Sequence, residues 1–241
     1  MERELFSIGE TANMLGLSIQ TLRRWDASGK FKAFRPDPNG HRYYKKIDID
    51  LFLNDIETLA EIWVNKEQGT EPNSEFYCTY SNIFKIRLDK MMADLKNISD
   101  LKTDTSLITA ITGEIGNNSF DHNLGQWPDI PGIFFAYDLK MKKIVLADRG
   151  QGVLKTLQRV KMDLKNDQDA LKVAFTEIIT GRAPERRGNG LKFVKQIILT
   201  NPIKFLFRSG DAELDIGEKD SKINIKKTEN QFHGSFVIIN F

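Results

Sequence analysis

Residues 114–123 read EIGNNSFDHN and crowd polar side chains onto what the surrounding pattern predicts to be an amphipathic helix. Glu114, Asn118 and His122 follow one another at intervals of four residues, which places them on one helical face. An acid and an imidazole can accept and release protons, and an amide can donate and accept hydrogen bonds. This face therefore either lines a site or forms a polar seam against a neighbouring domain.

Two glycine-containing motifs lie further along the chain. Residues 146–153 read LADRGQGV and end an apolar run, while residues 186–194 read RRGNGLKFV and come directly before a predicted helix. Glycines before a helix leave backbone N–H groups free to bind phosphate at the positive end of the helix dipole. Each motif alone is also compatible with a hairpin exit or an ordinary helix start.

Taken in this order, the three stretches resemble the N box and the two glycine boxes of the GHKL superfamily. That superfamily includes histidine kinases, the DNA gyrase B subunit, the heat-shock chaperone ATPase and MutL. The final run HGSFVIINF is similar to the last strand of the same fold. The resemblance covers roughly residues 80–241, and it implies a Bergerat two-layer α/β sandwich that binds ATP with Mg²⁺.

The resemblance also implies roles for individual side chains. Glu114 would orient or deprotonate the attacking water, Asn118 would give an oxygen to Mg²⁺, and His122 would stand near the phosphates. Asp148 would accept a hydrogen bond from the adenine amino group, and Ser235 would join Asp148 through a water molecule.

Further nucleotide contacts are implied in the glycine boxes and in the segment between them. The backbone would approach the nucleotide at Gly150, Gly152, Gly188, Gly190 and Leu191. The intervening TEIITGRAPERRGNG reads as a mobile lid, and its arginines are either phosphate contacts or plain surface charge: Arg182, Arg186 and Arg187.

The beginning of the chain predicts two short helices with a tight turn at Gly16. Ser18 is a natural N-cap for the second helix, with Ile19, Leu22 and Trp25 facing inward. The outward side chains suit a DNA major groove, because Gln and Arg read base edges and Arg and Thr hold phosphates: Gln20, Thr21, Arg23 and Arg24. Residues 18–46 carry eight basic side chains against two acidic ones, which also favours a nucleic acid partner.

The runs SIGETANMLGLSIQTLRRWDASGK and GHRYY resemble the winged DNA-binding domain of the MerR family and its excisionase relatives, over about the first 53 residues. The resemblance makes residues 18–26 the recognition helix and places Arg42 and Tyr43 on a wing that grips the DNA backbone. The alternative is a solvated basic face on a small helical domain. MerR-type regulators usually continue into a long dimerisation helix. Here the following helix, about residues 48–66, is short, which leaves the family's route to a homodimer open.

We therefore predict an α+β chain in three parts: a winged helix-turn-helix domain at 1–53, a helix and linker at 54–74, and a GHKL-type ATP-binding domain at 75–241. In the last part, the patterns predict helices at 81–96, 105–123, 154–160, 169–180 and 191–199, and strands at 132–139, 142–150, 203–216 and 234–241. We expect one mixed sheet with helices on a single face.

Composition limits the classes of protein to consider. With 40% hydrophobic and 28% charged residues, the chain can bury a core, and its net charge of +2 argues neither for nor against nucleic acid. The single cysteine, Cys78, favours a reducing compartment, and three scattered histidines give no zinc spacing. A charged start and the lack of an apolar run of 18 residues predict a cytoplasmic protein without a membrane partner.

Three functional hypotheses follow. The first is a DNA-binding regulator whose ATP-binding GHKL domain modulates binding to double-stranded DNA or to a protein partner. The second is an anti-sigma-type serine protein kinase tethered to DNA, with a protein phosphoacceptor. The third is a non-catalytic nucleotide-binding scaffold, against which the intact Glu114 argues; the first two make the chain an Mg²⁺-dependent ATPase or kinase.

Two other classes are not expected. A sensor histidine kinase needs a phosphoaccepting histidine in a dimerisation helix, and the helix predicted at 81–96 has none. Topoisomerase or mismatch-repair chemistry needs a transducer domain after the sheet, and none follows in this sequence.

Overall fold

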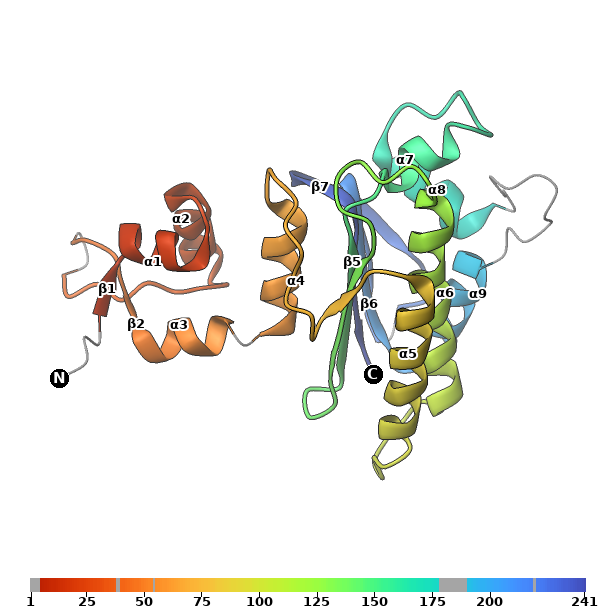
Figure 1. The fold of residues 1–241 in the computed structure, drawn as a ribbon, viewed down its shortest axis with the longest axis horizontal. Helices are drawn as coiled ribbons and strands as arrows, with labels where there is room; N and C mark the ends of the chain where they lie inside the picture. Colours follow the sequence, from red (N-terminus) through yellow and green to blue (C-terminus); the bar gives the residue numbers. More distant parts are fainter. Residues whose placement is uncertain (1–4, 38–39, 54, 178–189, 219) are drawn as a thin grey trace. The chain divides into compact units, whose positions relative to one another are not determined.

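The computed structural model describes residues 5–37, 40–53, 55–177, 190–218 and 220–241. The chain forms two compact units, Met1–Ile62 and Trp63–Phe241 (Figure 1). This division falls inside the part predicted as a helix and linker at 54–74, before its Gly/Pro/Ser cluster at 69–74. Each unit has its own hydrophobic core.

The first unit is built from short helices and a two-stranded antiparallel sheet. Its elements are β1 (Leu5–Ser7), α1 (Ile8–Leu15), α2 (Ile19–Ser28), β2 (Tyr43–Lys45), α3 (Lys46–Leu53) and the beginning of α4 (Ile56–Asn65). Ser7 and Glu10 form a capping box at the start of α1. Gly16 follows α1 with φ of 64°, and Ser18 caps α2 by accepting from the Thr21 N–H at 3.0 Å. This is the helix-turn-helix arrangement that the sequence predicts.

Two details of the first unit differ from the prediction. Ile19 does not face inward, since it is 42% exposed, and the buried face of α2 is made by Leu22, Trp25 and Asp26. The predicted single helix after the wing is two helices, α3 and α4. Asp55 starts the second of them, because its carboxylate accepts hydrogen bonds from both the N–H (3.0 Å) and the hydroxyl of Thr58.

The second unit is an α+β structure with a five-stranded sheet in the order β3-β4-β5-β7-β6. Its strands are β3 (Tyr77–Cys78), β4 (Ile133–Asp138), β5 (Lys143–Asp148), β6 (Lys204–Ile216) and β7 (Asn224–Asn240), and its helices are α5 (Ser81–Leu95), α6 (Thr105–Asn123), α7 (Gly152–Leu157), α8 (Asp167–Thr176) and α9 (Gly190–Thr200). Every pairing among the described strands is antiparallel, so the expectation of a mixed sheet is wrong. The sequence also predicts only the end of β7 as a strand.

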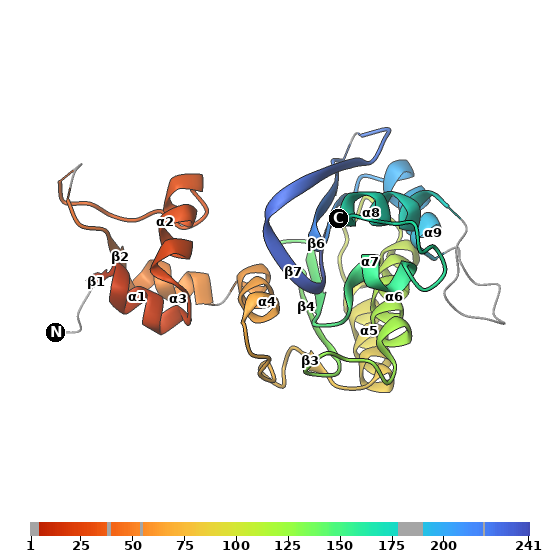
Figure 2. The same cartoon turned by 90° about the horizontal axis from the view of Figure 1, so that it is seen from above.

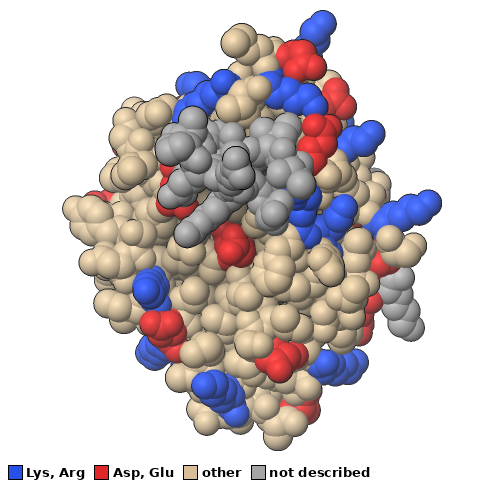
Figure 3. Space-filling model, turned by 90° about the vertical axis from the view of Figure 1, so that its right-hand side faces the viewer, with Lys and Arg blue, Asp and Glu red and all other residues tan. Residues whose placement is uncertain are grey.

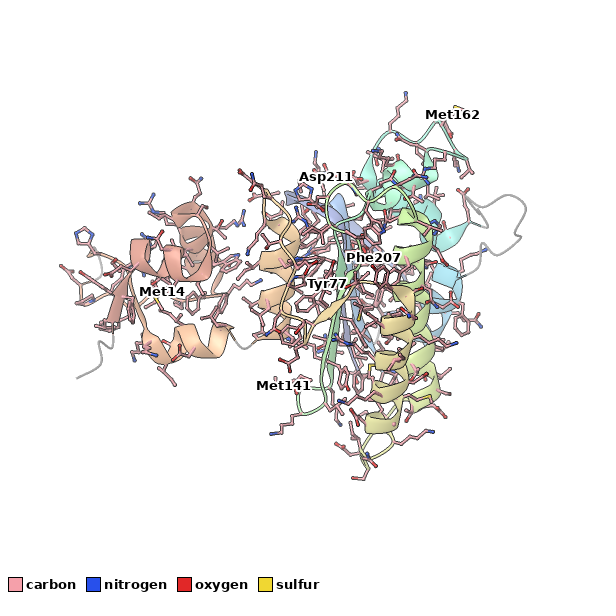
Figure 4. All side chains as sticks on the ribbon, viewed as in Figure 1. Met14, Tyr77, Met141, Met162, Phe207 and Asp211 are labelled. Carbon is pink, nitrogen blue, oxygen red and sulfur yellow. The ribbon has the colours of Figure 1, made fainter. Side chains whose placement is uncertain are left out.

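One face of this sheet carries the main core. Helices α5, α6 and α9 cover it in both ribbon views (Figures 1 and 2), and side chains such as Phe84, Ile111 and Phe207 meet there. Phe207 of β6 is labelled among the interior side chains in Figure 4. Fully burying one such apolar side chain is worth about 1.5–3 kcal/mol, so this layer dominates the stability of the unit.

The opposite face of the sheet also has a packing partner within the second unit, the side chain of Trp63. Side chains alternate along β4, so Phe134 points away from the core that contains Phe135. The ring of Trp63, in the last turn of α4, lies 6.2 Å from the ring of Phe134. The chain after α4 is also fastened to this unit, because Trp63 Nε1 donates to the Thr70 carbonyl at 2.7 Å.

The polypeptide between α4 and α5 is held by further contacts. Arg87 of α5 donates to the carbonyls of Ser74 (2.5 Å) and Glu75 (2.8 Å).

In the described part of the chain, no helix is long and apolar enough to cross a membrane, and no group of His, Cys, Asp and Glu side chains could hold a metal ion.

Candidate functional site

The predicted recognition helix α2 presents a polar outer face. Gln20, Arg23 and Arg24 are exposed, as the spacing predicts. Thr21 is half-buried, and its hydroxyl lies 2.9 Å from the Ser18 hydroxyl at the helix start. Exposed Gln and Arg side chains on a helix of this kind can reach base edges and phosphates.

A carboxylate in the C-terminal half of α2, that of Asp26, binds residues of the segment that follows the helix. Asp26 is buried and accepts from Arg42 Nε at 2.7 Å, from the Ala33 N–H at 3.0 Å and from Arg35. Tyr43, the other predicted wing residue, is half-buried in β2 and pairs with Phe34 through two backbone hydrogen bonds. The position of the Arg42 side chain is thus set by Asp26 of α2.

Burial raises the pKa of Asp26, but hydrogen bonds from Arg42 and Ala33 and the charge of Arg35 outweigh it, so the pKa is lowered overall. Because this pKa is lower in the folded state, the ionised Asp26 stabilises the folded protein at pH values above its unfolded-state pKa, about 3.9 for Asp. This stabilisation is lost as the pH falls through the folded-state pKa.

We expect Asp26→Asn to destabilise the first unit at pH 7 by about 1–3 kcal/mol, since it weakens hydrogen bonds to charged partners. Amide hydrogen exchange measures this loss as a lower free energy of opening of α2. The difference in this free energy between Asp26→Asn and wild type should shrink below about pH 4. Asp37→Asn, at an exposed position, is the matched control. Equal stability of Asp26→Asn and wild type at pH 7 would mean that the cluster does not hold the wing.

The second polar region is built on α6. Asp104 caps this helix by accepting from the Ser106 N–H at 2.7 Å, as the sequence predicts. Glu114, Asn118 and His122 are half-buried on the predicted face. The glycine at the start of α9 lies against this face, because a Cβ added at Gly190 would be 2.4 Å from Glu114 Oε2 and 3.7 Å from Asn118 Nδ2. The 114–123 stretch and the second glycine-containing motif therefore lie side by side.

Asp148, at the end of β5, is the most heavily hydrogen-bonded carboxylate of this region. Its Oδ2 accepts from the hydroxyls of Ser119 (2.7 Å) and Ser235, and its Oδ1 accepts from the Gly150 N–H at 2.8 Å. Burial raises the pKa of Asp148, and the hydrogen bonds from Ser235 and Ser119 oppose this without cancelling it. In this structure Ser235 contacts Asp148 directly.

Ser119 and Asn123 are functional candidates that the sequence reasoning missed. Asn123 is buried at the end of α6, and its Oδ1 accepts from the Gln151 N–H at 2.8 Å. A Cβ added at Gly150 would lie 2.1 Å from Asn123 Nδ2. The glycine at 150 is therefore required by the packing of the chain on α6. The sequence feature that could have identified them is their spacing in the 114–123 stretch, where Ser119 and Asn123 lie one helical turn apart.

His122 completes the α6 face as a neutral imidazole at neutral pH. Burial lowers its pKa, the positive charge of Arg159 lowers it further, and Asp148 opposes them with a smaller effect. A neutral imidazole can donate one hydrogen bond and accept another.

Other predicted residues are only partly placed. Gly152 begins α7 with φ of 77°, and the next N–H, that of Val153, donates to Ser209 Oγ at 3.0 Å. Leu191 is partly buried against the main core. Four predicted residues lie outside the described residues: Arg182, Arg186, Arg187 and Gly188.

Charges of both signs border the helix side of the second unit. Figure 3 views this side and shows Lys and Arg side chains interspersed with Asp and Glu side chains. After α7 the chain also carries an exposed apolar side chain, Met162, which is 88% exposed and is labelled in Figure 4.

Comparison with known proteins bears on the first unit. Residues 7–44 match the family described as MerR family regulatory protein. The chain is also 48% identical over 52 residues to the Type II methyltransferase M.Eco47II of Escherichia coli; this segment is 22% of the chain and 12% of that protein. The chain thus covers only a small part of that relative's length. Residues 7–44 are thus similar to the MerR family regulatory proteins, and this similarity, with the helix-turn-helix of α1 and α2, suggests DNA as a partner.

Proposed function

We propose that this chain is a DNA-binding regulator whose second unit binds ATP with Mg²⁺ and changes its affinity for DNA or for a protein partner according to the bound nucleotide. The observation that carries the proposal is the meeting of three motifs that are far apart in the sequence. Asp148 bonds to Ser119 and Ser235, while Gly190 lies against Glu114.

The arrangement supports a nucleotide site of the GHKL type. Asn118 would hold Mg²⁺ through its amide oxygen, since Mg²⁺ prefers oxygen ligands and keeps several waters. Glu114, one turn away, would orient or deprotonate a water molecule. The sheet with α5, α6 and α9 on one face is consistent with the Bergerat sandwich.

Adenine recognition would use the buried carboxylate. Asp148 has two serine hydroxyls and one N–H as donors, and each carboxylate oxygen can accept more than one hydrogen bond. The adenine amino group would be a further donor to the same carboxylate. The N–H groups at the start of α9 would face the phosphates.

ATPase and kinase activity are separable by one assay. Incubation of the protein with labelled ATP and candidate partner proteins releases free phosphate if the protein is an ATPase and labels a partner serine if it is a kinase. The methyltransferase activity named for the relative is not proposed here, because the match covers 12% of that protein.

The DNA-binding part of the proposal gives a prediction for the recognition helix. We expect Arg24→Ala to weaken duplex binding and, if Arg24 contacts a phosphate, to make the salt dependence shallower by about 0.9 in log–log slope. Titrations of the full-length chain with duplex DNA at several salt concentrations measure this.

Arg24 is a better choice than Arg42, whose replacement would also remove one of the three hydrogen-bond donors to the buried Asp26. Lys90→Ala on α5, at an exposed position, makes the same charge change in the other unit and should have no effect. Wild-type DNA affinity in Arg24→Ala at every salt concentration would contradict the assignment of α2 as the recognition helix.

Regulation itself is tested by DNA affinity at fixed salt without nucleotide, with ADP and with a non-hydrolysable ATP analogue. A coupling of about 1–3 kcal/mol, or about 5- to 150-fold in affinity, is usual for such switches. Three equal affinities would mean that the two units act independently.

A further inference from the structure

The residue directly after Asp148 is a buried arginine. The side chain of Arg149 is 1% exposed, and Asp129 pairs with it through Nε (2.8 Å) and Nη2 (2.6 Å). Its Nη1 donates to the backbone carbonyls of Trp63 (2.9 Å) and Val64 (3.0 Å). We call these four residues, Trp63, Val64, Asp129 and Arg149, the α4 clasp.

The partners explain how a buried charge is tolerated here. An unpaired buried guanidinium would be strongly destabilising. Here Asp129 neutralises the charge of Arg149, and each guanidinium nitrogen donates to an oxygen atom. The two carbonyls belong to the last turn of α4, where helix carbonyls lack intrahelical partners and carry partial negative charge. Arg149 thus caps the C-terminal end of α4.

All four residues of the α4 clasp belong to the second unit, and the clasp holds the end of the helix that leads into this unit. Helix α4 runs from Ile56 to Asn65 and so continues from the first unit into the second. Arg149 lies between Asp148 and Gly150 in the sequence. The Gly150 N–H donates a hydrogen bond to the Asp148 carboxylate. The backbone on both sides of Arg149 is therefore tied to the same carboxylate that the proposed function assigns to adenine.

We propose that Arg149 is a positioning residue through which nucleotide bound at Asp148 tightens the hold on the C-terminal end of α4. The inference rests on the proposed function. A ligand that engages the Asp148 carboxylate restricts the 148–150 backbone, and that restriction fixes the base of the Arg149 side chain. By linkage, a tighter clasp in turn favours the bound nucleotide.

The test is amide hydrogen exchange on the full-length chain with and without saturating ATP and Mg²⁺. We expect ATP to slow the exchange of residues 63–70 by about 5-fold or more, within the usual range of coupling between sites. A separate ATP titration distinguishes the two failures. If ATP does not bind, the proposed function fails and the inference fails with it; if ATP binds but exchange at 63–70 is unchanged, the inference alone is overturned.

Three variants make the test specific to the clasp. Arg149→Lys keeps the charge but cannot reproduce the planar fork of donors, and Asp129→Asn weakens the clasp at its more exposed member. Both should lose the slowing at 63–70 at saturating ATP, whereas protection of the paired strands β5 and β7 should remain. Arg208→Lys, which alters the Arg208–Glu213 ion pair on β6, is the control and should respond to ATP like wild type. A wild-type response in both clasp variants would overturn the inference.

Discussion

Replacing Asp148 with asparagine is expected to lower ATP affinity by about 5- to 150-fold, or 1–3 kcal/mol, because one of two buried acceptor oxygens is exchanged for an NH₂ donor. In the folded chain both carboxylate oxygens already accept hydrogen bonds, from Ser119, Ser235 and Gly150. An amide NH₂ in place of Oδ1 would face the Gly150 N–H, and an NH₂ in place of Oδ2 would require the serine hydroxyls to accept instead of donate. In either case the adenine amino group would lose one possible acceptor.

Calorimetric titration of ATP in the presence of Mg²⁺ measures this change. Asp215→Asn, at an exposed position on β6, is the matched control and should leave affinity unchanged. An Asp148→Asn variant that is folded and binds ATP as tightly as wild type would contradict the assignment of Asp148 to adenine.

Glu114→Gln is expected to reduce ATP turnover by about 10²- to 10⁴-fold while ATP affinity stays close to that of wild type. Glutamine keeps the shape of the side chain beside Gly190 but cannot take up a proton from water. Loss of kcat without a change in ground-state binding is the pattern of a group that acts mainly in the transition state.

Phosphate release and ATP affinity should be measured on the same preparation. Asp89→Asn, at an exposed position on α5, is the control for removal of one carboxylate. If Glu114→Gln turned over ATP at the wild-type rate, Glu114 would not be the base. A wild type without hydrolysis or phosphotransfer would favour the scaffold hypothesis instead.

The local parts of the candidate site could be predicted from the sequence because they depend on helical spacing. Intervals of four residues put Glu114, Asn118 and His122 on one face whatever the rest of the chain does. The roles of Ser119 and Asn123 could not be read in this way. They are set by contacts with Asp148 and Gln151, which lie 28 or 29 residues further along the chain.

The same reasoning explains the errors in the fold. A local pattern predicts a strand but not its partner, so the antiparallel pairing of the whole sheet was not predictable from the runs of apolar residues. The Gly/Pro/Ser cluster at 69–74 has a linker's composition, yet a hydrogen bond from Trp63 to Thr70 ties it to the second unit. The sequence analysis assigned no role to Arg149, because its partners at 63 and 64 are more than 80 residues away.

In the first unit, spacing and capping were sufficient for the helix-turn-helix but not for its charged core. Ser18 and Gly16 mark the helix boundaries through local backbone preferences. A buried aspartate on an inward helical face goes against the usual preference, and only its tertiary partners, Arg35 and Arg42, explain it.

The most direct test is a calorimetric titration of the 241-residue chain with ATP, in Mg²⁺ and again with the metal removed by EDTA. We predict saturable binding at a single site in Mg²⁺ and weaker binding without it, since Asn118 would reach the phosphates partly through the metal. Absence of binding at millimolar ATP in both conditions would contradict the claim that the second unit is a nucleotide-binding domain.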